Sequence, residues 1–162
     1  IAKKGYVASI TVKLNSLTDT ILLDALYKAV KAGVKVNLII RGILTIKRTN
    51  EKNAGKINAI SIVDQYLEHA RVIIFNNKGN QKVFISSADW MVRNLDHRIE
   101  VAVPIVDPVI KKELIDIIHI QLKDNQKARI LDGELSNKYV PSAKATSFKS
   151  QEETYKFLKG KR

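Results

Sequence analysis

Residues 6–40 run YVASITVKLNSLTDTILLDALYKAVKAGVKVNLII, and this stretch decides the predicted fold. Its first part alternates in polarity and is rich in β-branched side chains, which predicts a strand over residues 6–14. Residues 34–40 are mostly apolar and predict a second strand. Gly33, directly before that strand, predicts the end of an intervening helix. The apolar positions of this helix recur at helical spacing and are Leu22, Ala25, Leu26, Ala29 and Val30.

The connection into this helix carries a start signal. Ser16 and Asp19 have the spacing of a capping box, with aspartate in place of the usual glutamate, so we expect the helix to begin at Ser16. A strand, a short helix and a second strand with tight connections form a βαβ unit. Its two strands are parallel and its crossover is right-handed.

The rest of the chain adds strands and helices to this unit. Residues 57–63 fit either a strand or the start of a helix, and the polar residues 47–56 predict a loop. Asp107 followed by Pro108 predicts the start of a long helix that ends near residue 124. Strands are also predicted over residues 71–75, 82–87 and 98–104, with a hairpin turn at residues 76–80. Ser150 and Glu153 have the spacing of a capping box, which predicts the start of a short terminal helix.

Together these elements predict an α/β fold with a mixed, mostly parallel sheet flanked by helices. Residues 1–130 form the predicted domain, and residues 131–162 form a predicted irregular tail that ends in the short helix. The chain opens at Ile1 without an initiator methionine, from which we expect a fragment of something longer.

The composition narrows the classes of function. The 162 residues carry a net charge of +12, and residues 1–56 alone carry 11 basic and 3 acidic groups, so polyanions are the expected partners. Aromatic residues make up only 6% and are not interleaved with the basic ones, so no nucleic acid is expected. The absence of cysteine excludes disulfides, thiolate zinc sites and a cysteine nucleophile, and it fits a cytoplasmic setting. No apolar run approaches the roughly 18 residues of a membrane span, although a basic surface also permits association with a membrane.

His69 is the histidine most suited to chemistry. It lies two residues before Arg71 at the entry to an apolar strand, so both side chains point to one face. An imidazole can move a proton while a guanidinium holds phosphoryl oxygens, which suits phosphoryl transfer. A surface role for the pair stays open. His97 and His119 are interpreted as surface or packed residues.

Arg41 is the second candidate. It precedes Gly42 at the carboxyl end of the second strand, where open α/β sheets bind ligands, and its guanidinium fork matches phosphate oxygens. A surface ion pair is the alternative.

Further candidates come from the polar block after the strand at 82–87, namely Ser87, Asp89, Arg93 and Asn94, although Trp90 could simply anchor this loop. Neither a Walker loop, a dinucleotide fingerprint, a helical zinc motif nor a serine-nucleophile elbow is present, and no metal ligand is assigned.

Four stretches within residues 5–130 resemble the C-terminal domain of the polyphosphate kinase family. They are VKLNSLTD at residues 12–19, AGVKVNLIIRGI at 32–43, SIV and YLEHAR within 61–71, and ISSADWM followed by RNLD and RIEV within 85–101. The last block is long and unusual in composition. The family polymerises the terminal phosphate of ATP into polyphosphate, so the resemblance implies a phosphotransferase.

The resemblance also implies a fold and a distribution of the catalytic residues between domains. The two C-terminal domains of the family each look like half of a phospholipase D-type fold, and the nucleophilic histidine that becomes phosphorylated lies in the preceding domain. Arg41 and His69 match the positions that contact the nucleotide phosphates. The implied partners are ATP or ADP, polyphosphate and the preceding domains, with Mg²⁺ bound largely outside this segment. The fragment alone is expected to be inactive.

One departure from the family pattern falls directly after Arg41. Residues 44–49 replace the cysteines, leucine, arginine and proline that are usual there, and Lys47 and Arg48 could replace the usual cation. Two alternatives remain open. The chain could be a phospholipase D-like phosphodiesterase or nuclease half, which would form its site as a homo-oligomer, or a non-catalytic basic module that binds polyanions.

Overall fold

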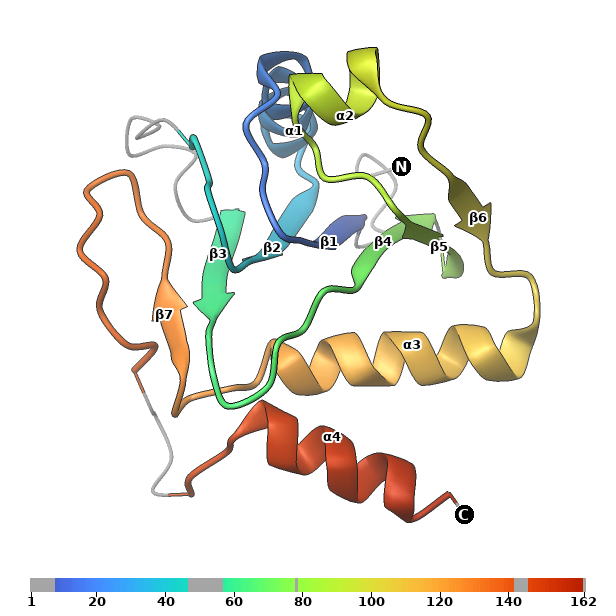
Figure 1. Ribbon diagram of the computed structural model, residues 1–162, viewed down its shortest axis with the longest axis vertical. Helices are drawn as coiled ribbons and strands as arrows, with labels where there is room; N and C mark the ends of the chain where they lie inside the picture. Colours follow the sequence, from blue (N-terminus) through green and yellow to red (C-terminus); the bar gives the residue numbers. More distant parts are fainter. Residues whose placement is uncertain (1–7, 47–56, 78, 142–145, 162) are drawn as a thin grey trace.

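The computed structural model describes residues 8–46, 57–77, 79–141 and 146–161. The predicted loop at 47–56, with Lys47 and Arg48, therefore lies outside the described residues. Figure 1 shows a sheet with helices on both sides. Its elements are β1 (Ser9–Leu14), α1 (Thr20–Lys31), β2 (Lys35–Ile40), β3 (Ile57–Ile62), β4 (Arg71–Asn77), β5 (Asn80–Ser86), α2 (Val92–His97), β6 (Ala102–Pro104), α3 (Pro108–Gln121), β7 (Ala128–Ile130) and α4 (Ser150–Lys159).

The predicted βαβ unit is confirmed, because β1 and β2 pair in parallel on either side of α1 in the sequence. The predicted helix start is wrong. Asp19 is the N-cap and accepts a hydrogen bond from Leu22 N at 2.8 Å, because the Ser16 hydroxyl is buried and instead accepts from Ile43 N. Gly33 follows α1 at φ 92°, a left-handed conformation that glycine adopts without strain.

The sheet has the order β6-β5-β4-β1-β2-β3-β7 and is mixed, as predicted. Its pairings are not mostly parallel, however. Of the six pairings between these described strands only β1–β2 and β2–β3 are parallel, and the other four are antiparallel. The hairpin turn between β4 and β5 enforces one of the antiparallel pairings, whereas the crossover through α1 returns the chain so that β1 and β2 pair in parallel.

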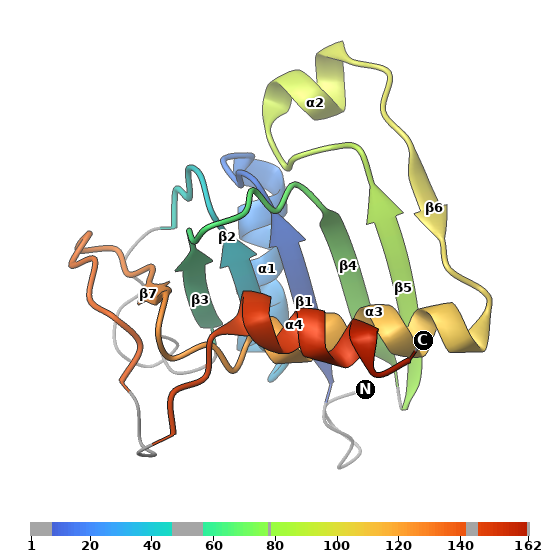
Figure 2. The same cartoon turned by 60° about the horizontal axis from the view of Figure 1, so that its bottom comes forward.

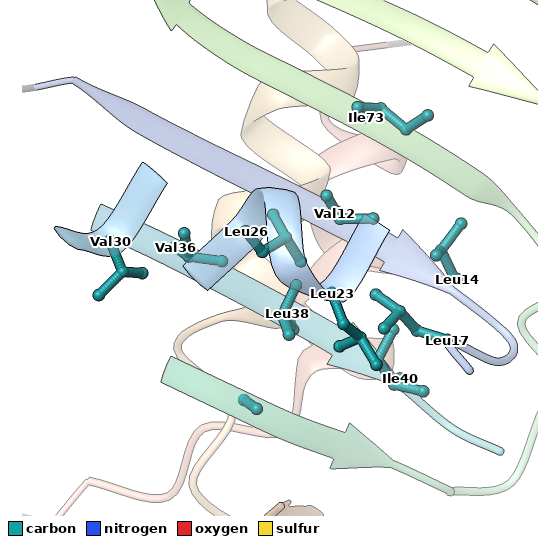
Figure 3. Packing of buried hydrophobic residues seen from close by; sticks show 11 residues of the cluster. Val12, Leu14, Leu17, Leu23, Leu26, Val30, Val36, Leu38, Ile40 and Ile73 are labelled. Atoms are coloured by element: carbon teal, nitrogen blue, oxygen red, sulfur yellow. The ribbon is translucent and has the colours of Figure 1, made fainter. Parts of the chain in front are cut away.

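The core has one layer on each face of the sheet. The side chains of α1 pack against β1 and β2 in one cluster, part of which Figure 3 shows, and Ile115 and Ile118 of α3 pack in the other. Successive residues of β2 alternate between the clusters, with Leu38 in the first and Ile39 in the second. In Figure 2, α4 lies alongside α3 on that second face.

The remaining differences from prediction concern short elements. Residues 57–62 form a strand, which settles the open alternative, whereas only Ala102–Pro104 of the predicted strand at 98–104 is in the sheet. Helix α2 and strand β7 were not predicted. The described helices include none that is long and apolar enough to cross a membrane.

Gly42 joins the end of β2 to the turn after β1. Its N–H donates to Asn15 O at 2.7 Å, and a Cβ at Gly42 would lie 2.8 Å from that oxygen and from Ser16 Oγ. Gly42→Ala is therefore expected to lower the free energy of unfolding by about 1–3 kcal/mol, measured by urea denaturation. Gly160→Ala is the control, because its nearest new contact would be 3.4 Å; equal effects of both substitutions would contradict the prediction.

Candidate phosphate-binding site

Arg41 and His69 meet at one edge of the sheet. Arg41 directly follows β2, and His69 lies just before β4, whose first residues pair with the end of β1. Arg41 Nη2 lies 3.0 Å from His69 Nδ1. A guanidinium can only donate, so Nδ1 is the acceptor and the ring proton of His69 is on Nε2. The pair therefore presents a cation next to a neutral imidazole whose remaining nitrogen can donate a hydrogen bond.

The charge of Arg41 is not neutralised by a carboxylate of the described residues. Its Nε is buried and has no hydrogen-bond partner there, whereas His69 is exposed. Two other cations nearby, Lys13 and Arg71, are each paired with an acid. Unlike Lys13 and Arg71, Arg41 therefore carries a charge that no described carboxylate offsets, which suits it to an anionic ligand.

Arg71 and Asp89 form a two-pronged ion pair next to this site. Arg71 Nε and Nη2 donate to Asp89 Oδ1 and Oδ2 at 3.2 and 3.1 Å, and Arg71 Nη1 donates to His69 O at 3.2 Å. Asp89 also accepts from Asn15 N and Ser16 N. Burial alone would raise the pKa of Asp89, but the hydrogen bonds from Arg71, Ser16 and Asn15 outweigh it and lower that pKa.

Ser87 and Asn94 meet at Glu100. The Ser87 hydroxyl donates to Glu100 Oε2, and Asn94 Nδ2 donates to Oε1 at 2.7 Å. These two hydrogen bonds lower the pKa of Glu100, which keeps it ionised. Ser87 Oγ also accepts from Val101 N, so the group fixes the loop that follows α2.

A third acid stands directly before His69. Lys13 Nζ donates to Glu68 Oε2 at 2.9 Å, with the lysine side chain only 7% exposed. A cavity of about 470 Å³ lies next to this pair and is lined by side chains of the segment before β4, of α3 and of α4, His69 among them.

The structure thus brings four of the candidate residues into one network, namely Arg41, His69, Arg71 and Asp89. Ser87 and Asn94 form a second group around Glu100, and Arg93 is exposed on α2. His97 and His119 are exposed, as interpreted from the sequence. The sequence analysis missed Lys13 and Glu100; a lysine within an apolar strand was the available signal for the first.

A family model described as "Polyphosphate kinase C-terminal domain 2" matches residues 1–151. This match covers almost the whole chain and includes each residue of the network described above. The chain belongs to this family. The predicted resemblance is confirmed, and the match continues past residue 130 into the predicted tail.

Relatives and solved structures agree with this membership. Polyphosphate kinases of Klebsiella pneumoniae and Escherichia coli K12 are each 49% identical over 158 residues, which is 98% of this chain and 23% of theirs. The crystal structure of polyphosphate kinase from Porphyromonas gingivalis superposes with a TM-score of 0.93 at 43% identity, covering 98% of this chain and 24% of that one. The chain therefore spans about a quarter of the length of these polyphosphate kinases.

The fold has a wider distribution than the family. The phospholipase D family member Nuc from Salmonella typhimurium superposes with a TM-score of 0.58 at 20% identity, covering 81% of this chain and 86% of that one. NucT from Helicobacter pylori superposes with a TM-score of 0.55 at 16% identity, covering 71% and 79%. These likenesses confirm the expected phospholipase D-type fold.

A site for a metal ion is not formed by the described residues, since no three of their histidine, aspartate or glutamate side chains come together.

Proposed function

We propose that this chain is the nucleotide-phosphate-binding domain of a polyphosphate kinase, which reversibly transfers the γ-phosphoryl group of ATP to polyphosphate. The observation that carries the proposal is the 3.0 Å contact between Arg41 and His69, in a chain of this family. A guanidinium without a described carboxylate partner is suited to phosphate oxygens, and the Nε2–H of a neutral imidazole beside it can donate a hydrogen bond to such an oxygen.

In the proposed reaction a histidine nitrogen of the preceding domain attacks the γ-phosphorus, the bond to the ADP oxygen breaks, and a phosphohistidine forms. A terminal oxygen of polyphosphate then attacks that phosphorus and releases the histidine. Two displacements replace one difficult transfer. Arg41 would stabilise the charge on the transferred group, and His69 would donate from Nε2 to a phosphate oxygen. Arg71 and Asp89 would hold the backbone of His69 in place.

The partners follow from this scheme. They are ATP or ADP, polyphosphate and the preceding domains of the same enzyme, with assembly into a homo-oligomer as a further part of the proposal. Mg²⁺ would arrive on the nucleotide phosphates, held mostly by other domains. A cytoplasmic location is also part of the proposal.

The isolated chain is expected to bind inorganic tripolyphosphate and ATP but to show no ATP-dependent polymerisation, because the nucleophile lies elsewhere. Isothermal titration and an assay of polymer formation measure the two properties. Turnover by the isolated chain would contradict the proposal, and so would hydrolysis of a simple phosphodiester, which a phospholipase D-like nuclease half predicts.

Salt separates specific binding from simple attraction of polyanions. Binding through the +12 net charge should collapse steeply with salt and ignore His69→Ala. Specific binding should instead weaken with His69→Ala at every salt concentration. The exposed His119→Ala is the matched control and should leave the affinity unchanged.

A further inference from the structure

The segment that delivers His69 has little apolar support of its own. Tyr66 and Leu67 expose 67% and 74% of their surface. The cavity of about 470 Å³ lies between this segment and the apolar side chains of α3 and α4. Because close packing does not fix the segment there, polar contacts must set the position of its backbone.

Gln151, in the first turn of α4, supplies such contacts. Its Nε2 donates to Tyr66 O at 2.8 Å, and its Oε1 accepts from Tyr66 N at 3.0 Å. The same Nε2 donates to Glu68 Oε1 at 3.1 Å. The amide therefore engages both backbone groups of Tyr66, as a neighbouring strand would, and also reaches the carboxylate next to His69.

Glu68 is held from two other sides. Lys13 of β1 donates to its Oε2 at 2.9 Å, and Gln121 at the end of α3 donates to the same oxygen at 2.5 Å. Three elements that are distant in sequence thus converge on the residue before His69. Of the three donors, Gln151 is the one that also fixes backbone.

The position of Gln151 is itself determined by Asp124. This buried carboxylate accepts from Ser150 N at 2.7 Å through Oδ2. Its Oδ1 accepts from the backbone of the turn that enters β7, at Gln126, Lys127 and Ala128. The start of α4 is therefore tied to the sheet and does not depend on packing of the helix alone.

We propose that Gln151 is a positioning residue for His69: it holds the segment from Tyr66 to Glu68 so that His69 Nδ1 meets Arg41. The proposal rests on the function proposed above for its effect on phosphate binding, but its geometric part stands alone. It also assigns a function to the tail beyond residue 130, to which the sequence analysis assigned none.

The test uses nuclear magnetic resonance of the ¹⁵N-histidine-labelled chain, with Gln151→Ala and Gln151→Glu. Glutamate keeps the side-chain length and favours the first turn of a helix, but it cannot donate to Tyr66 O and it repels Glu68. In both variants the ring signals of His69 should shift and broaden. Affinity for inorganic tripolyphosphate should fall about tenfold.

The chain contains its own controls. The signals of His97 and His119 should stay in place. His119 is an informative control because it lies on α3, against which α4 packs, so general damage to the fold would move its signals as well. Glu152→Ala, at the next residue of α4, should change nothing at His69, since Glu152 forms its ion pair with Lys149.

Unchanged His69 signals in both Gln151 variants would overturn the proposal, as would equal shifts at all three histidines. If Gln151→Ala unfolds the chain, Gln151→Glu decides, since α4 is expected to persist in it. If the unsubstituted chain fails to bind tripolyphosphate, the proposed function falls. Selective movement of His69 would then still support the positioning role.

Discussion

Arg41→Ala is expected to lower the rate of polyphosphate synthesis about 10²–10³-fold, the usual cost of losing one donor to developing charge. Arg41 offers a guanidinium that no described carboxylate neutralises. The nearby cations Lys13 and Arg71 are not free to replace it, because they are engaged by Glu68 and Asp89.

The rate can be measured by grafting this chain in place of the matching domain of the Escherichia coli relative, 49% identical over 158 residues. Arg41→Lys is the informative control, because lysine keeps the charge but not the fork that reaches His69 and a phosphate together. It should recover part of the rate. A rate for Arg41→Ala within threefold of the unsubstituted graft would contradict the assigned role.

The pairing of Arg41 with His69 illustrates what sequence can predict. Periodicity placed Arg41 after one strand and His69 before another. The two meet because β4 is antiparallel to β1, which lies between β4 and β2, so the start of β4 and the end of β2 are at the same edge of the sheet. The βαβ unit was also predictable from periodicity, since α1 and the two strands are long enough to display their periods. The chemistry of the two side chains then followed from residue type.

Other parts could not be predicted from local pattern. Strand β7 is three residues long, too short to show alternation, and it forms by pairing with the longer β3. The local pattern predicted a strand at 98–104, but it could not show that only the three residues of β6 would pair with β5. The contacts of Gln151 with Tyr66 span 85 residues. The local sequence around either residue does not predict a contact with the other. The start of α1 was predicted wrongly because the Ser16 hydroxyl accepts a hydrogen bond from Ile43 N, in the loop after β2, and does not cap the helix.

Asp89→Ala is expected to cost about 3–5 kcal/mol of unfolding free energy at pH 7, the range for removing one partner of a buried ion pair. Asp89 is 3% exposed and is held to Arg71 by two hydrogen bonds. Its removal leaves the Arg71 guanidinium without a counter-charge and the backbone N–H groups of Asn15 and Ser16 without acceptors. Urea denaturation measures the loss.

The pH dependence provides a second measurement. Because the pKa of Asp89 is lower in the folded chain than in the unfolded one, its stabilisation is complete above the ordinary value and is lost as pH falls through the folded value. The difference between the unsubstituted chain and Asp89→Ala should thus be constant between about pH 7 and 5 and shrink below about pH 4. A difference that grows in acid would contradict this assignment.

Two variants separate the functions of the Asp89 carboxylate. Asp132→Ala removes a carboxylate that also accepts backbone hydrogen bonds, from Glu134 and Ser136, but has no ion pair with a described residue, so its effect should be much smaller. Asp89→Asn keeps an acceptor for the turn after β1 while giving up the charge, and it should fall between alanine and the native residue. If asparagine is as harmful as alanine, the ion pair with Arg71 supplies nearly all the stabilisation. If asparagine is nearly neutral, Asp89 acts chiefly through the turn, and the backbone of His69 does not depend on the charge.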